Sequence, residues 1–306
     1  MSTSSAFSPT EIDKIATMAH GIRHRVLEHT VKNNGGYLSQ ACSAAEILAS
    51  LYTKLVDLAP LKDALSPRDF AGVPSKNFKE YITGAEFHGE KKPNLDRLFI
   101  SPAHYALVVY AALIECGRLT ESSLDKFNKD GSTVEMIGAE HSPGFETTTG
   151  SLAQAISQAG GVALARKING DTGNTWVFMS DGEFQEGQTW EALGTISFHK
   201  LNTMRIIVDI NQNQVDGPME KVMNIEPIAA RVRSFGWDVD EVDGNNIEQI
   251  LIAGLNDSDR PKAILCYTDP TKGIDILKDR ADALHYVRFA HVFEKNKYMQ
   301  FLSKWK

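Results

Sequence analysis

The most constraining feature of this sequence is a strand–helix–strand unit with a polar segment after each strand. Residues 175–179 and 205–210 are apolar and rich in strand-forming residues, and apolar residues recur at helical spacing between them. Two strands joined through a helix run parallel in one sheet. The polar segments 180–187 and 211–217 are therefore expected at the carboxyl ends of neighbouring strands, where open α/β sheets bind ligands.

The residues of these two polar segments suit a hard cation and an anion bound to it. Mg²⁺ prefers oxygen ligands from carboxylates, carbonyl groups and phosphates. Asp181 offers a carboxylate, Asn211 a side-chain carbonyl and Asn213 a backbone carbonyl. Gly182 allows a diphosphate to approach the backbone, and a helix that begins near Glu186 points its N-terminal amides toward that anion. The unit predicts a site for a metal-bound diphosphate.

The two segments also resemble the thiamine diphosphate-binding fingerprint, and within it the transketolase family. The first reads Asp-Gly-x-x-Gln-Glu-Gly-x-x-Trp-Glu-Ala from Asp181, and the second reads Asp-x-Asn-x-x-Gln-x-Asp-Gly from Asp209. In particular, the chain resembles the N-terminal subunit of transketolases that are split into two chains. The resemblance implies a diphosphate-binding α/β domain over residues 1–306, as a single domain.

Strands and helices alternate along the rest of the chain, which indicates a doubly wound, mainly parallel sheet flanked by helices. The expected helices span 8–33, 152–168, 225–235, 247–255 and 287–305, and further strands are expected at 98–100, 237–242 and 263–267. Residues 43–46 are interpreted as a capping box that opens a second helix. Residues 60–93 are polar, rich in proline and without a sustained period, and we interpret them as a loop excursion.

Composition and charge exclude several classes of protein. The net charge of −7 argues against a nucleic-acid partner. No apolar run reaches the length of about 18 residues that a membrane helix needs. The three cysteines lack the spacing of a disulfide framework or a zinc site. We therefore expect a cytoplasmic protein with neither a membrane nor a nucleic acid as partner.

The resemblance assigns further residues to the cofactor. The phrase Ser-Pro-Ala-His resembles the family's Ser-x-Gly-His, whose histidine, here His104, reaches the diphosphate side of the cofactor. The phrase Thr-Gly-Ser-Leu resembles one whose glycine and leucine, here Gly150 and Leu152, line the aminopyrimidine and diphosphate channel. Glu183 is assigned to the cofactor as well. Ala153 stands where the family commonly has glycine.

Two positions depart from the family pattern around the substrate. Tyr37 stands where a Gly-His-x-Gly histidine usually faces the donor sugar, and Met136 occupies another expected histidine position, for which His141 could substitute from nearby. His285 lies close to the family's Trp-His-Gly histidine. We expect His104, His141 and His285 to move protons and hold hydroxyls, with pKa values near neutrality. Tyr37 suggests a donor other than the usual sugar phosphates.

The resemblance also implies the reaction and the partner. Thiamine diphosphate, bound through Mg²⁺ or through Ca²⁺ or Mn²⁺ in its place, would supply the carbanion chemistry that transfers a two-carbon ketol unit from a ketose to an aldose. The family's activating glutamate belongs to the pyrimidine-binding domain that follows, and this chain ends where that domain would begin. We therefore expect a C-terminal partner subunit that supplies that domain and glutamate, in a heterotetramer of two of each chain. Glu186 is expected at the interface between two such assemblies.

Two alternatives remain open from the sequence. The α subunit of a 2-oxo acid dehydrogenase has a similar fingerprint, although the Gln-Glu-Gly-x-x-Trp-Glu-Ala phrase matches transketolases better. A non-catalytic, scaffolding paralogue is the second alternative, and the substitutions at Tyr37 and Met136 motivate it. Assays of ketol transfer and of oxidative decarboxylation would separate these functions.

Overall fold

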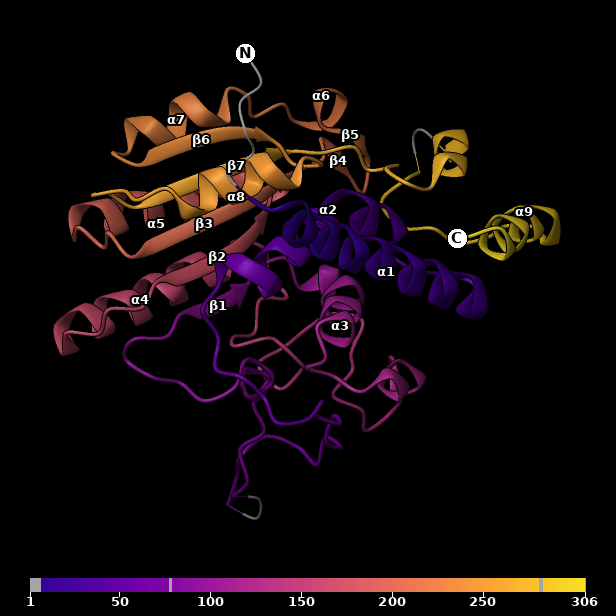
Figure 1. The fold of residues 1–306 in the computed structure, drawn as a ribbon, viewed down its shortest axis with the longest axis horizontal. Helices are drawn as coiled ribbons and strands as arrows, with labels where there is room; N and C mark the ends of the chain where they lie inside the picture. Colours follow the sequence, from indigo (N-terminus) through magenta and orange to yellow (C-terminus); the bar gives the residue numbers. More distant parts are fainter. Residues whose placement is uncertain (1–6, 77–78, 281–282, 306) are drawn as a thin grey trace.

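A parallel β-sheet forms the centre of the molecule in the computed structural model, which describes residues 7–76, 79–280 and 283–305 (Figure 1). Within the described residues the sheet has five strands in the order β1-β2-β3-β7-β6, and every neighbouring pair is parallel. The strands are β1 (Arg97–Ile100), β2 (Thr175–Ser180), β3 (Met204–Ile210), β6 (Asp238–Asp243) and β7 (Lys262–Tyr267). This topology confirms the predicted α/β fold, and β2 and β3 are neighbours as expected.

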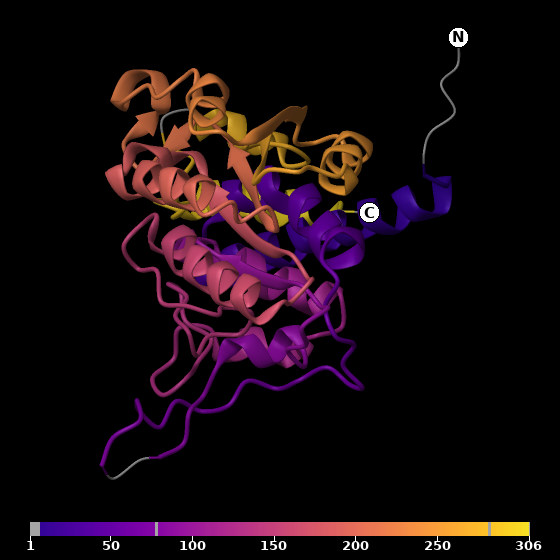
Figure 2. The same cartoon turned by 90° about the vertical axis from the view of Figure 1, so that its left-hand side faces the viewer.

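Helices cover both faces of the sheet (Figures 1 and 2). Those on one face are α1 (Pro9–Asn33), α2 (Leu38–Ser50), α3 (Ala106–Glu115) and α8 (Ile247–Leu255), and those on the other are α4 (Gln154–Asn169), α5 (Gly187–Phe198) and α7 (Ile228–Ser234). Side chains of a strand alternate between the two cores. Along β3, for example, Ile207 faces the first core, whereas Ile206 and Val208 face the second.

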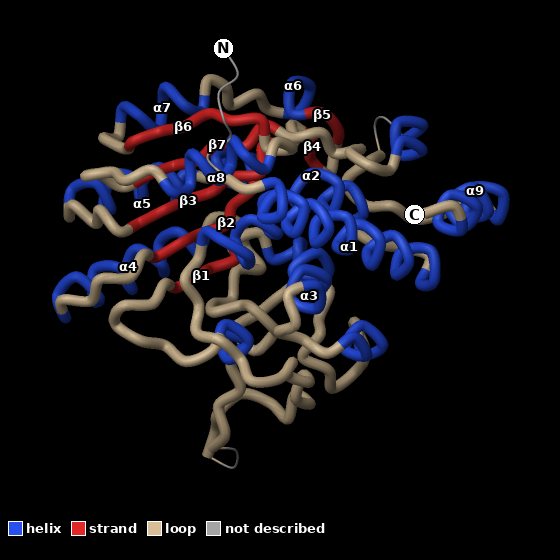
Figure 3. Tube along the Cα trace, in the orientation of Figure 1, coloured by secondary structure: helices blue, strands red, loops and turns tan. Residues whose placement is uncertain are grey.

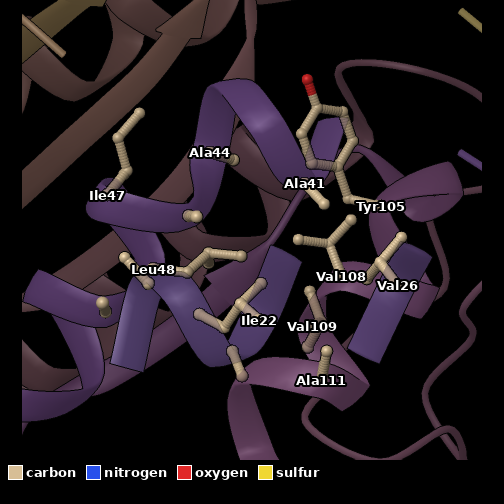
Figure 4. Packing of buried hydrophobic residues seen from close by; sticks show 14 of the residues in the cluster. Ile22, Val26, Ala41, Ala44, Ile47, Leu48, Tyr105, Val108, Val109 and Ala111 are labelled. Atoms are coloured by element: carbon tan, nitrogen blue, oxygen red, sulfur yellow. The ribbon is translucent and has the colours of Figure 1, made fainter. Parts of the chain in front are cut away.

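The first core is dominated by close packing of α1, α2 and α3, as Figure 4 shows. α1 begins where the sequence predicts, because Ser8 and Glu11 form a capping box and Pro9 occupies the first turn. It ends at Asn33, and the next residue, Asn34, caps it in a left-handed conformation with φ of 58°. Alanines on α2, such as Ala41 and Ala44, allow this close approach.

The predicted start of α2 is wrong. The helix begins at Leu38, so residues 43–46 lie inside it and do not form a capping box. Ser43 donates instead to the buried carboxylate of Asp209 on β3, and Glu46 forms an ion pair with Arg23 of α1. These partners are distant in sequence, so the local pattern of residue types could not reveal them.

Short elements complete the chain. They are the π-helix Leu51–Leu55, the 3₁₀ helices Gly84–His88, Ala103–Tyr105, Glu121–Lys126, Asp181–Gln185 and Asp275–Arg280, the hairpin of β4 (Asn213–Gln214) and β5 (Gly217–Pro218), and the helices α6 (Met219–Val222) and α9 (Val292–Ser303). α9 forms within the helical tail predicted at 287–305. The β4–β5 hairpin directly follows β3 and was not predicted.

The excursion (residues 60–93) consists of loops apart from the 3₁₀ helix Gly84–His88, within the part that the structure describes; its residues 77 and 78 lie outside that part. Figure 3 shows it as loop, and Figure 2 shows it reaching away from the sheet. Near the end of the excursion the backbone packs directly against residue 142, and position 84 must be glycine there, because a Cβ on Gly84 would lie 1.7 Å from the carbonyl oxygen of Ser142. The assignment of residues 1–306 to one domain stays a prediction.

In the described ranges of the chain, no helix combines the length and the apolar character that crossing a membrane would require.

Candidate functional site

A cavity of about 380 Å³ opens at the carboxyl ends of β2 and β3. Ten of the residues that the sequence assigned to a site line it: Tyr37, His104, Gly150, Leu152, Asp181, Gly182, Glu186, Asn211, Asn213 and His285. They come from six stretches of chain that are far apart in sequence. The fold thus brings the two polar segments of the strand–helix–strand unit together, along with the histidines and the Thr-Gly-Ser-Leu phrase.

Asp181 is the first residue after β2, and its side chain links the two polar segments. Its Oδ1 accepts a hydrogen bond from the amide of Gly182 at 2.8 Å, and its Oδ2 accepts one from the amide of Gln212 at 2.7 Å. Burial, and then the negative charge of Asp209, raise the pKa of Asp181 to about 8. Among the described residues that line the cavity, none is Lys or Arg. A cation bound beside Asp181 would offset this uncompensated burial of a carboxylate.

Asn211 and Asn213 follow β3 and form a compact turn. The Oδ1 of Asn211 accepts from the amide of Asn213 at 2.9 Å, and the Nδ2 of Asn213 donates to the backbone carbonyl of Asn211 at 2.8 Å. In the β4–β5 hairpin, Asn213 lies opposite Pro218. The amide of Met219 donates to the carbonyl of Gln212, and because bonded and non-bonded pairs alternate along an antiparallel ladder, the carbonyl of Asn213 points away from β5. The donor set of carboxylate, amide oxygen and carbonyl therefore fits a hard cation.

Aromatic rings and imidazoles gather at another side of the cavity. The ring centroids of His104 and His285 lie 5.1 Å apart, and that of Tyr37 lies 5.5 Å from His104 and 5.7 Å from His285. Burial, and then His285, lower the pKa of His104 to about 3, and burial lowers the pKa of His285 to about 4. The expected values near neutrality are thus wrong for these two residues in the chain by itself. Both imidazoles are neutral at neutral pH, and each offers one donor and one acceptor.

Gln40 is a residue of this region that the sequence did not point to. Its Nε2 lies 3.3 Å from Nδ1 of His285 and donates to the backbone carbonyl of His285 at 3.1 Å. It is buried near the start of α2, where nothing in the local pattern distinguishes it from a core residue. Gln40 therefore holds the loop that carries His285 against α2.

His141 does not line the cavity. Its Nε2 lies 3.0 Å from Oε2 of Glu135, and its ring stacks on Phe70 of the excursion with centroids 4.2 Å apart. These contacts place His141 at the junction of two loops, outside the residues that line the cavity. The structure therefore gives no support to the predicted catalytic role of His141.

Glu183 lies beneath the cavity wall and has no exposed surface. Its carboxylate accepts from the amide of Ala153 at 2.9 Å, from the amide of Ser180 at 2.8 Å and from the hydroxyl of Ser101. Burial raises the pKa of Glu183 to about 7, although these hydrogen bonds lower it. Glu183 joins the segments that carry Asp181, Leu152 and His104, so its assigned contact with the cofactor is better described as support of the wall.

Gln214 and Tyr105 also line the cavity and were not singled out from the sequence. The Oε1 of Gln214 is buried and has no hydrogen-bond partner among the described residues, so it is an acceptor open to a ligand. Its only signal was its place as the glutamine of the Asp-x-Asn-x-x-Gln phrase. Tyr105 gave no signal, because an aromatic residue at a helix start is usually part of the core.

Comparisons with known proteins agree on one family. Residues 77–283 match the family described as transketolase, thiamine diphosphate binding domain. The transketolase family protein y4mO of Sinorhizobium fredii is 34% identical over 275 residues, which cover 88% of each chain. The 6-deoxy-6-sulfo-D-fructose transketolase subunit SqwG of a Clostridium species is 30% identical over 270 residues, 87% of this chain and 88% of the relative.

A solved structure shows the same fold. A variant transketolase from Pichia stipitis in complex with fructose 6-phosphate superimposes with a TM-score of 0.69 at 21% identity. The match covers 95% of this chain but 44% of that chain. This chain therefore spans less than half the length of the solved transketolase.

Proposed function

Because this chain belongs to the transketolase family, we propose that it is the diphosphate-binding subunit of a Mg²⁺-dependent transketolase that a second kind of chain completes. The observation that carries this proposal is the shared cavity at the ends of β2 and β3. Asp181, Asn211 and the histidines His104 and His285 all line it, although they lie far apart in sequence.

The metal and the diphosphate would be held by residues of the two polar segments. Asp181, the Oδ1 of Asn211 and the backbone carbonyl of Asn213 would hold Mg²⁺, and Gly182 would leave room for the diphosphate. Gln214, with its open acceptor, lies in the same wall. α5 begins at Gly187, so its N-terminal amides and positive dipole end add to the attraction for an anion.

When bound, thiamine diphosphate supplies the carbanion chemistry of ketol transfer. The protein's own contribution is to orient the sugar. At neutral pH the neutral imidazoles of His104 and His285 can each donate one hydrogen bond to, and accept another from, the sugar's hydroxyls. Burial raises the pKa of Tyr37, so its hydroxyl stays protonated and can also donate. These three groups lie on one side of the cavity, which suits a single polyhydroxylated ligand.

The charges of the cavity lining are one reason to propose a partner chain. The described lining contains acidic residues and neutral imidazoles but no Lys or Arg, so it offers no positive charge to pair with an anionic group on a sugar. The relative SqwG is itself named a subunit. We propose a C-terminal partner that supplies the pyrimidine-binding domain, the activating glutamate and the contacts to that anionic group. Two copies of each chain would form a cytoplasmic heterotetramer, with Glu186 at the interface between the two halves.

The test is binding of thiamine diphosphate to the reconstituted complex, measured as a function of Mg²⁺ concentration. Asp181→Ala should abolish Mg²⁺-dependent binding, because it removes the charged ligand. Glu220→Gln is the matched control, since it removes a negative charge from the exposed surface of α6 nearby and should leave binding unchanged. Unchanged binding in Asp181→Ala would mean that the metal clamp, formed by Asp181, Asn211 and Asn213, is wrongly assigned.

Turnover assays of the same complex separate the alternative functions. We expect ketol transfer from a ketose to an aldose. Oxidative decarboxylation of a 2-oxo acid would instead support a dehydrogenase-type subunit, and the absence of both activities would support a scaffolding paralogue.

The most specific part of the proposal concerns the identity of the donor sugar. Tyr37 replaces the expected histidine and packs against Tyr286 with centroids 4.9 Å apart, which adds aromatic bulk beside His285. We propose a modified or otherwise anionic ketose as donor. Ordinary turnover of xylulose 5-phosphate would count against this specificity. The variant Tyr37→His should shift preference toward that substrate.

A further inference from the structure

A second buried carboxylate lies behind the proposed metal clamp. Asp209 is on β3 and has no exposed surface. Its Oδ2 accepts from the hydroxyl of Ser43 at 2.5 Å, the hydroxyl of Tyr105 at 2.8 Å and the Nδ2 of Asn211 at 3.3 Å, and its Oδ1 accepts from the hydroxyl of Thr268 at 2.6 Å. These donors come from α2, from the turn after β1, and from the ends of β3 and β7.

Without a bound cation, this buried carboxylate lowers the stability of the folded chain. All four donors are neutral, and the carboxylate that they surround has no exposed surface. A buried charge without a cationic partner is destabilising, and apolar residues could fill the same space. The carboxylate therefore calls for a role other than packing.

Its position suggests that role, because Asp209 contacts a proposed metal ligand. The carboxamide of Asn211 can point either way round, with its oxygen or its nitrogen toward the protein interior. On the interior side it meets Asp209, an acceptor, and the hydroxyl of Tyr105, to which its Nδ2 donates at 3.1 Å. Only the nitrogen can satisfy Asp209, so the oxygen is turned to the opposite side.

Tyr105 reinforces the same orientation. Its ring lies beside Ala41 and Val108 in the apolar cluster, and its hydroxyl points away from that cluster, as Figure 4 shows. The single hydroxyl proton is donated to Asp209, so the oxygen of Tyr105 is left as an acceptor for Asn211. Asp209 thus fixes Asn211 both directly and through Tyr105.

We propose that Asp209 is the positioning residue of the metal clamp, which turns the side-chain oxygen of Asn211 toward the cation and places a second negative charge behind Asp181. The inference rests on the proposed metal site and gives a role to Asp209, the first residue of the Asp-x-Asn phrase. The cation in turn compensates the two buried carboxylates.

The test uses the reconstituted complex and Mn²⁺ as a probe, with free Mn²⁺ measured by electron paramagnetic resonance in the presence of thiamine diphosphate. Asp209→Asn keeps the shape but removes the negative charge behind Asp181 and replaces the charged acceptor that Asn211 and Tyr105 share with a weaker, neutral one. We expect Mn²⁺ affinity to fall by about 10–100-fold, the range found when the outer-shell partners of metal ligands are removed. The thermal stability of the metal-free chain gives the second readout.

Two further variants keep the inference falsifiable if Asp209→Asn does not fold. Tyr105→Phe removes the relay but keeps the carboxylate, and a smaller loss of Mn²⁺ affinity is expected. Thr268→Val removes a donor to the other oxygen of Asp209 without touching Asn211, and Mn²⁺ affinity should stay within about threefold, a small change beside the loss expected for Asp209→Asn.

The outcomes distinguish this inference from the proposed function. If Asp181→Ala abolishes Mn²⁺ binding while Asp209→Asn and Tyr105→Phe only lower the melting temperature, Asp209 is structural and the inference is overturned. If Asp181→Ala itself leaves Mn²⁺ binding intact, the proposed metal site fails. Loss of affinity in the order Asp181→Ala, Asp209→Asn, Tyr105→Phe supports both.

Discussion

Ala153 adopts a backbone conformation that ordinarily belongs to glycine. Its φ of 63° is left-handed, and its amide donates to Glu183 at the point where α4 begins. An L-residue in this region costs about 1–2 kcal/mol, and glycine in its place would lose about 0.5–1 kcal/mol of chain entropy. The sequence identified the position as one that the family commonly fills with glycine, but the reason became visible only with the turn.

Ala153→Gly should therefore raise the free energy of unfolding by about 0.5–1 kcal/mol, the difference between those two effects. Denaturant-induced unfolding of the chain measures it. Ala155→Gly makes the same chemical change inside α4, where the residue is helical and buried, and should lower the free energy of unfolding. A destabilised Ala153→Gly variant would show that the left-handed turn carries no strain.

His29 on α1 predicts a dependence of stability on pH. It is 7% exposed, its Nε2 has no hydrogen-bond partner among the described residues, and its ring packs edge-on against Phe127. Burial, and then Lys32, lower the pKa of His29 from 6.5 to about 4. Between these values the unfolded chain binds a proton that the folded chain does not. The free energy of unfolding therefore falls as pH is lowered through this window.

His29→Phe removes the group that binds this proton in the unfolded chain. We expect the slope of unfolding free energy against pH between 6.5 and 4 to decrease by up to about 1.4 kcal/mol per pH unit. Chemical denaturation at several pH values measures the slope, and the two proteins should show the same slope above pH 7.5. An unchanged slope in the acid range would mean that His29 is protonated in the folded chain.

At the scale of elements, one buried carboxylate fastens the excursion to the sheet. The two oxygens of Glu146 share the N–H of Nε of Arg97 on β1, at 3.1 and 2.8 Å, and one of them also accepts from Nη2 of Arg97. The carboxylate lies within 3.6 Å of Lys91 and 3.5 Å of His88. Burial raises the pKa of Glu146, but the hydrogen bonds from His88 and Arg97 outweigh it and lower the pKa to about 2. The carboxylate is thus ionised and paired.

Glu146→Gln should loosen the excursion, because it leaves Arg97 largely buried without its partner. Breaking a fully buried pair costs about 3–5 kcal/mol, and we expect the lower end because Arg97 is partly exposed. Limited proteolysis followed by mass spectrometry should detect faster cleavage within residues 60–93. Lys126→Met breaks the exposed pair with Asp69 and is the control with little effect. Equal cleavage rates would show that Glu146 does not anchor the excursion.

The elements that the sequence predicted well are those with a periodic pattern or a local signal. The helix at 8–33, the apolar runs of β2 and β3 and the helix at 247–255 all appear as expected. Other features depend on contacts between distant segments. The early start of α2 and the wall formed by Glu183 each need partners from elsewhere in the chain, so residue patterns along a short stretch do not contain them.

For the whole molecule, the position of the site could be predicted from the sequence, whereas the protonation behaviour of its histidines could not. The two polar segments could be placed together from the sequence, because parallel neighbouring strands end at the same edge of a sheet. The pKa values of His104 and His285 could not, since burial depends on the assembled cavity. In our proposal the cavity forms only part of the cofactor site. Val215, which lines the cavity and is 73% exposed, would be covered by the partner subunit.

This incompleteness predicts how ligand binding and stability are linked. Thiamine diphosphate with Mg²⁺ should raise the melting temperature of the mixture with the partner subunit, and at 100 times its dissociation constant it should stabilise by about 2.7 kcal/mol. The chain alone should show a much smaller shift at the same ligand concentration. Differential scanning fluorimetry makes the comparison, and equal shifts would mean that this chain forms a complete cofactor site.

The most direct test of the central claim is a crystal structure of the reconstituted complex with thiamine diphosphate and Mn²⁺, in which anomalous scattering locates the metal. We predict one peak at the ends of β2 and β3, about 2.0–2.3 Å from an oxygen of Asp181 and from the side-chain oxygen of Asn211, with the diphosphate as a further ligand. A metal-bound diphosphate elsewhere in the complex, with Asp181 and Asn211 not coordinating it, would contradict the account.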